Sequence, residues 1–148
     1  MQKPKRPTRI LCRLICIISL ALIIASCSVP NLEPPQCTAA RISVKRFYSL
    51  HFANDNGRTE EYLKAREQYL TDRLAEILSS DEPKNDYFTQ TEEFPKAFRV
   101  GGCTAESEEK AALQVVLLWR DDTRNEQTEV VVRTVRTGDI WLIDSVGN

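Results

Sequence analysis

The sequence predicts an α+β domain in which N-terminal helices pack on one face of a curved antiparallel sheet. Apolar residues recur at helical spacing between residues 38 and 78, whereas residues 110–146 are rich in Val, Leu, Ile, Thr and Trp. Thr137-Gly138-Asp139 lies between two of these strand-like segments and predicts a tight hairpin. Helices followed by strands are typical of domains whose helices and strands form separate layers.

The first expected helix spans residues 38–52, with Thr38 as its N-cap. Its buried face is predicted from positions spaced at i, i+4, i+7, i+8 and i+11, namely Ala40, Val44, Phe47, Tyr48 and His51. Asn54-Asp55-Asn56-Gly57 supplies a stop signal. A second helical stretch is expected from Thr59, with a restart capped by Thr71 and an end before Pro83. Residues 85–95 are interpreted as a loop containing a short turn.

Three antiparallel strands are expected at residues 110–119, 128–137 and 140–146. The first of them is apolar on both faces in its middle, so we expect the helices to cover one of these faces. Residues 98–100 are expected to form a further strand, which ends at Gly101-Gly102 because the backbone can bend there.

The first 26 residues have the layout of a signal peptide. A basic segment up to Arg13 is followed by the twelve residues 14–25, of which only Ser19 is polar. A helix needs about 20 apolar residues to span a bilayer, so this run matches a signal peptide better than the alternative, a permanent membrane anchor. Ile24-Ala25-Ser26-Cys27 resembles the lipobox of bacterial lipoproteins, which implies cleavage before Cys27 and lipidation of its thiol.

This resemblance implies an exported protein anchored in a membrane of the cell envelope through an N-terminal lipid. By similarity to lipoproteins of two-membrane bacteria, Ser28 in place of an Asp implies sorting to the outer membrane, facing the periplasm. Residues 27–36 contain three prolines and no hydrophobic period, so we expect a tether there and a single domain over residues 37–148.

The net charge of this domain disfavours some classes of binding partner. Removal of residues 1–26 leaves fifteen basic and twenty-one acidic residues, a formal net charge of −6. Such a surplus repels phosphate backbones and anionic lipid, and no run of Lys or Arg after residue 26 offsets it locally. Nucleic acid is therefore not expected as a partner.

The domain keeps two of the five cysteines, Cys37 and Cys103, once the signal peptide and the lipidated Cys27 are set aside. An even pair in an oxidising compartment predicts a disulfide, and two buried free thiols are the alternative. Two cysteines and a single histidine do not supply the three or four ligands of a zinc site. We expect no metal and no cofactor.

Four short segments carry a family resemblance. They are Arg46-Phe47-Tyr48, Tyr69-Leu70-Thr71-Asp72-Arg73-Leu74, Asp86-Tyr87-Phe88 and Trp141-Leu142-Ile143-Asp144. Their order resembles exported bacterial domains of the cystatin-like, nuclear-transport-factor-2-like superfamily, over residues 37–148. The resemblance implies a cone whose open end is a possible pocket, and it carries no catalytic residue to this chain. Relatives include both isomerase-like enzymes and non-catalytic binding domains, so the fold does not choose between them.

Several side chains are candidates to line that pocket: Phe47, Tyr48, His51, Trp119, Trp141 and Asp144. His51 is suited to general-base chemistry near neutral pH, or to a structural role at a helix end. Asp144 is suited to proton abstraction if it faces inward with a raised pKa, or caps a turn if it faces outward. The two tryptophans either line an apolar ligand site or belong to the core.

Three functions follow from these readings. The first is a non-catalytic envelope lipoprotein that binds a partner protein or a small apolar ligand through the sheet face or the mouth of the cone. The second is an isomerase-like or hydrolase-like enzyme, which requires His51 and Asp144 to converge on a cavity. The third is a periplasmic inhibitor or immunity protein. No catalytic motif supports the enzyme, so the first is the main expectation.

Overall fold

The structure, a computed structural model, describes residues 32–54, 59–80, 85–120 and 122–147. Residues 33–148 form one compact unit. The predicted signal peptide, the lipobox and Cys27 lie outside the described residues, as do most of the stop signal at 54–57 and Pro83.

The first helix begins earlier than the sequence predicts. Helix α2 spans Pro35–Ala53, and its N-cap is Pro34, so the prediction of Thr38 as N-cap is wrong. Proline is favourable in the first turn of a helix for two reasons. Its fixed φ suits the helix, and it lacks only a backbone N–H that would have no partner within the helix at this position. The last two residues of the expected tether, 27–36, are therefore helical.

The two following helices begin where the sequence predicts, near Thr59 and after Thr71. Helix α3 spans Glu60–Glu67, and the Thr59 side chain accepts a hydrogen bond from the Tyr62 amide at 3.2 Å. Helix α4 spans Asp72–Ser80, and Thr71 Oγ1 accepts from the Leu74 amide at 3.3 Å. These hydroxyl groups satisfy amides that have no partner within the helix.

Four strands form one antiparallel sheet in the order β1-β2-β3-β4. They are β1 Ala97–Ala105, β2 Lys110–Arg120, β3 Asn125–Thr137 and β4 Ile140–Gly147. The predicted α+β class and the three expected C-terminal strands are confirmed, with β3 beginning three residues before its expected start. Gly138, with φ of +62°, makes the tight turn between β3 and β4.

Strand β1 continues through the glycine pair that was expected to end it. The register passes from Val100 opposite Val115 to Cys103 opposite Leu113, so β1 holds one more residue than β2 over this interval. Gly101 and Gly102 thus form a β-bulge, which bends a strand without terminating it.

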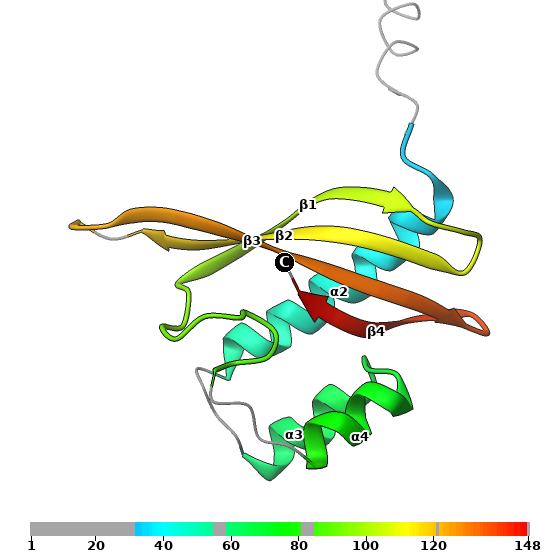
Figure 1. The fold of residues 1–148 in the computed structure, drawn as a ribbon, viewed down its shortest axis with the longest axis horizontal. Coiled ribbons are helices and arrows are strands. Elements are labelled where there is room, and N and C mark those ends of the chain that lie inside the picture. The colour runs from blue at the N-terminus through cyan, green and yellow to red at the C-terminus, as the bar shows by residue number, and fades with distance from the viewer. Residues whose placement is uncertain (1–31, 55–58, 81–84, 121, 148) are drawn as a thin grey trace, which may run out of the picture. The chain divides into compact units, whose positions relative to one another are not determined.

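The helices lie on one face of the sheet and at one of its edges. Figure 1 shows α2 crossing behind the strands, with α3 and α4 beside β4. The predicted buried face of α2 is confirmed, since Ala40, Val44, Phe47, Tyr48 and His51 are all buried. They pack against the alternating residues of β2 and β3 that face the helix, including Leu113, Val115, Leu117, Val130 and Val132.

A short segment covers the outer edge of β4. The Thr71 amide donates to the Ile143 carbonyl at 2.9 Å, and the Ile143 amide donates to the Tyr69 carbonyl at 2.7 Å. This blocks an edge that would otherwise present unpaired backbone groups. None of the helices in the described ranges is long and apolar enough to cross a membrane.

Candidate functional site

Three of the six candidate pocket residues come together on α2. Phe47, Tyr48 and His51 are buried on its sheet-facing side, where the Phe47 and His51 rings stack with centroids 5.7 Å apart. The rings of Phe88 and Phe94, from the loop before β1, lie 5.3 and 5.4 Å from the His51 ring. The end of α2 is therefore enclosed by aromatic side chains.

His51 is hydrogen-bonded through both ring nitrogens. Nδ1 lies 2.5 Å from the Tyr62 hydroxyl of α3, and Nε2 lies 3.2 Å from Asp86 Oδ1. An ionised carboxylate only accepts, so Nε2–H donates to Asp86, and in the neutral imidazole Nδ1 accepts from the Tyr62 hydroxyl. The three side chains join α2, α3 and the loop that follows α4.

Backbone amides fix the position of Asp86. Its Oδ1 accepts from the Phe88 amide at 3.0 Å and from the Thr89 amide at 2.8 Å. Burial acts to raise the pKa of Asp86, but the hydrogen bonds from His51 and Thr89 and the charge of His51 outweigh it and lower this pKa. Asp86 therefore stays ionised and orients the imidazole.

The order Tyr–His–Asp is that of a nucleophile, a base and an orienting carboxylate, but the tyrosine is not activated. Burial raises the pKa of Tyr62 to about 12, and only 5% of this residue is exposed. His51 is 6% exposed and both of its nitrogens are occupied. Such an arrangement stabilises the packing of three segments and offers a substrate neither a nucleophile nor a free base.

Asp144 lies elsewhere. Register shifts between Arg133 and Thr134 leave Asp144 as the extra residue of a bulge in β4. Its Oδ1 accepts from Thr71 Oγ1 at 3.0 Å, and its Oδ2 forms an ion pair with Arg73 at 2.9 Å. It therefore holds the start of α4 against β4, and the structure does not bring it together with His51.

The two tryptophans are at opposite ends of the sheet. Trp119 is opposite Glu126 of β3 and Trp141 is opposite Arg136, ten residues further along the same strand. At about 3.3 Å per residue the two positions are roughly 30 Å apart, so the two side chains cannot line one small site. Both are buried core residues. The indole N–H of Trp119 is buried and has no hydrogen-bond partner among the described residues, and the Arg124 guanidinium lies over its ring, 5.1 Å from the centroid.

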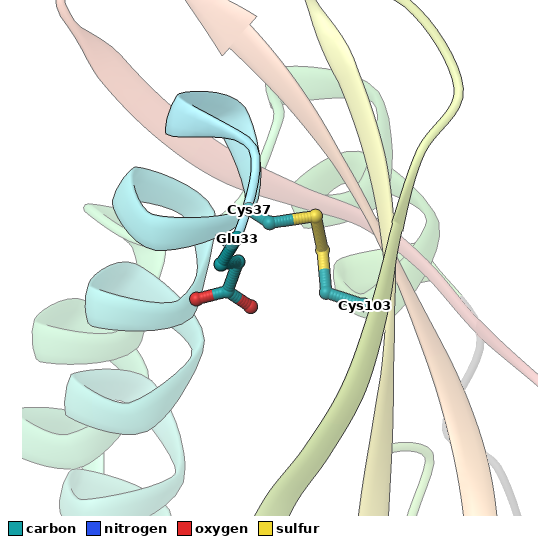
Figure 2. Close-up of side chains that lie close together, drawn as sticks. All are labelled: Glu33, Cys37 and Cys103. Atoms are coloured by element: carbon teal, nitrogen blue, oxygen red, sulfur yellow. A yellow bond between two sulfur atoms is a disulfide. The ribbon is translucent and has the colours of Figure 1, made fainter. Parts of the chain in front are cut away.

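The predicted disulfide is confirmed. Cys37 in the first turn of α2 is bonded to Cys103 of β1, with Cα atoms 5.8 Å apart (Figure 2). Next to it, Arg41 donates to the carbonyl oxygens of Val100 and Gly101 at 3.2 and 2.5 Å, at the bulge in β1. The start of α2 is thus fixed to β1 covalently and through these hydrogen bonds.

Glu33 completes this cluster through an ion pair with Arg41. The hydrogen bond from Arg41 lowers the pKa of Glu33. A carboxylate oxygen of Glu33 and the two sulfur atoms lie within 4.8 Å of one another. Figure 2 shows the three side chains close together. The sulfur atoms are bonded to each other and are not thiolates, so this group of atoms is not a metal site in the oxidised protein.

The second face of the sheet carries no helix of the described chain. Pairing places alternate residues of the four strands on it, because residues directly opposite each other share a face. Its apolar members are Ala97, Ala112, Val116, Leu118, Val131, Val135, Ile140 and Leu142. We call this surface the helix-free face. Val116 at its centre is 3% exposed and Ile140 at its border is 56% exposed.

Four exposed cations lie on the helix-free face. They are Arg99, Lys110, Arg120 and Arg133, against one carboxylate, Glu129. None of the four forms an ion pair within the described part of the chain. No run of Lys or Arg marks these cations in the sequence, because β pairing gathers residues that are far apart along the chain.

Comparison with known proteins leaves the family open. No family model matches the chain, and no curated protein does. One similar solved structure is a protein of unknown function from Bacteroides thetaiotaomicron, with 12% identity and a TM-score of 0.47. The match covers 91% of this chain and 99% of that one.

Proposed function

We propose that this protein is an exported, lipid-anchored envelope protein whose domain acts by binding through the helix-free face, without catalysis. The observation that carries the proposal is the composition of that face. Apolar side chains occupy its middle, and four exposed cations lie around them. Surfaces of this kind are typical of contact sites, where apolar area contributes affinity and charge selects the partner.

The anchor rests on the sequence and is consistent with the chemistry of the domain. Ile24-Ala25-Ser26-Cys27 resembles a lipobox, and the Cys37–Cys103 disulfide is the kind of bond that forms in exported proteins. The two features support the same compartment independently.

The environment of His51 favours binding over catalysis. Tyr62 and Asp86 occupy its two nitrogens, and Asp144 is held by Thr71 and Arg73. The two groups that an isomerase-like mechanism would need have separate structural partners. The structural roles of both side chains therefore account for their presence.

We also propose that the domain is a cystatin-like, nuclear-transport-factor-2-like cone. Support comes from a 19-residue helix packed across a four-stranded antiparallel meander. In this arrangement the helix occupies the inner face of the sheet, and the outer face is left for contacts.

Chemical footprinting in the native envelope tests the proposal. Membranes from the producing cells are treated with an arginine-specific dicarbonyl reagent, and modification is quantified by peptide mass spectrometry. Arg99, Arg120 and Arg133 are expected to react more slowly in the envelope than in the detergent-purified protein. Arg46, an exposed residue of α2 outside any ion pair of the described chain, is the internal control and is expected to react alike in both.

Two results would contradict the proposal. Recovery of the protein in the soluble fraction would contradict the proposed lipid anchor. Equal reactivity of the face arginines in envelope and detergent would show that nothing occupies the helix-free face.

A further inference from the structure

We infer that the helix-free face binds the anionic phospholipid surface of the bilayer that holds the Cys27 lipid. The inference rests on the proposed function and names the partner of the same face.

The face has the opposite charge to the rest of the domain. Its four cations and single carboxylate give +3, whereas residues 33–148 as a whole carry −6. The remaining residues therefore sum to −9. A domain with this distribution is attracted to an anionic surface in one orientation and repelled in the others.

The tether keeps this charged domain close to the bilayer. Six residue steps separate Cys27 from Glu33, where the compact unit begins. At about 3.5 Å per residue they span at most roughly 20 Å, even when fully extended. An anchored domain thus meets the lipid surface continuously, at a high effective concentration, and a weak attraction is enough to orient it.

A second copy does not suit the same face. Two helix-free faces in contact would place two net positive surfaces against each other, which is unfavourable. The apolar part is also modest, since Val116 is nearly covered and Ile140 is the one large apolar side chain of the face that is more than half exposed. Binding is therefore expected to be electrostatic, at the headgroup level, and sensitive to salt.

Reconstitution of the purified, lipidated full-length protein tests the inference. One set of vesicles contains phosphatidylcholine alone, and in the other part of this lipid is replaced by phosphatidylglycerol. Each cation near an anionic surface shifts the orientation equilibrium about five-fold, so three arginines together predict at least a ten-fold slower modification on anionic vesicles. Arg46 is expected to react equally on both. The protection should disappear at about 1 M salt, where the Debye length falls to roughly 3 Å.

Two matched double variants distinguish the effect of cations on this face from the effect of the domain's total charge. Acylation of Lys110 serves as the readout. On anionic vesicles Lys110 is expected to be protected in the unmodified protein and in the control Lys45→Gln/Arg46→Gln, which removes two exposed cations of α2. Protection is expected to be lost in Arg99→Gln/Arg133→Gln, which removes two cations of the face.

The outcomes distinguish the two proposals. If the protein carries no lipid and does not float with vesicles, this result contradicts both the proposed function and the inference. Anchored protein whose face arginines react equally on both vesicle types overturns the inference alone. Protection in native envelopes but not on anionic vesicles would assign the face to a protein partner and would also overturn it.

Discussion

Removal of the disulfide is expected to cost the domain a large part of its stability. The Cys37–Cys103 bond joins residues separated by 66 positions. In the chain-entropy model, breaking a disulfide that closes a loop of this length lowers the free energy of unfolding by about 4 kcal/mol, because the denatured chain gains conformational freedom. A domain of this size has a total stability of roughly 5–15 kcal/mol, so the reduced protein should be marginal.

Urea unfolding measures this change directly. The two buried tryptophans, Trp119 and Trp141, report on the transition by their fluorescence. With a slope of about 1.5 kcal/mol per molar urea, a loss of 4 kcal/mol moves the midpoint down by roughly 2–3 M. The slope itself should rise slightly, because an unlinked denatured chain is more expanded.

The double variant Cys37→Ala/Cys103→Ala is the matched control. It should unfold close to the reduced protein and should not respond to reductant. A midpoint that moves by less than about 0.5 M on reduction would refute the reasoning, because closure of the loop would then contribute little to stability.

Three further predictions concern the polar contacts. Arg41→Leu is expected to lower the free energy of unfolding by about 2 kcal/mol, because two carbonyl groups of β1 lose their charged donor. In the same urea assay, the control Lys45→Leu should change this free energy by less than about 0.5 kcal/mol. His51→Phe should cost about 2–3 kcal/mol, and clearly less in a Tyr62→Phe background, since the buried hydroxyl left without a partner is then absent; equal costs in both backgrounds would contradict this coupling. The folded-state pKa of Asp86 is lowered, so its ionisation stabilises the fold above about pH 4 and this contribution is lost as the pH falls through the folded pKa. Asp86→Asn should therefore flatten the acid side of a plot of Tm against pH, and an unchanged profile would count against the role of this carboxylate.

Local sequence signals predicted the elements and several of their ends, but not the start of α2 or the end of β1. The helical period from Ala40 to His51, the helix start near Thr59 and the cap at Thr71 depend on interactions within a few residues, and the structure confirms them. The start of α2 at Pro35 depends on the choice between two possible caps. The disulfide and the Arg41 contacts with β1 hold this turn in place, and neither is visible in local sequence.

The glycine pair shows how tertiary contacts override a local signal. Gly101-Gly102 was expected to end a strand, yet β1 continues to Ala105. The bulge accommodates one extra residue, and the Arg41 guanidinium binds carbonyl groups there. The two glycines, which predict a flexible strand end, therefore form a β-bulge of defined geometry instead.

Candidate functional residues were predicted with less success, for two physical reasons. His51 was found as the one histidine on a buried helical face, but its partners Tyr62 and Asp86 are 11 and 35 positions away. The cations of the helix-free face lie on three different strands, so no run of basic residues marks them. The alternation of charged residues on the face that no helix covers would have been the signal, once the register of the sheet was known.

Lipidation of Cys27, which we propose tethers the disulfide-bonded domain to the membrane, can be measured directly. An intact mass of the protein extracted from its native membrane tests it most directly, with the Cys27→Ala chain as the comparison. We expect the mass of a chain that begins at Cys27 and carries two or three acyl groups, with a gain of two protons on reduction. An unmodified full-length mass would contradict the anchor, and with it the proposed binding of the helix-free face to the bilayer.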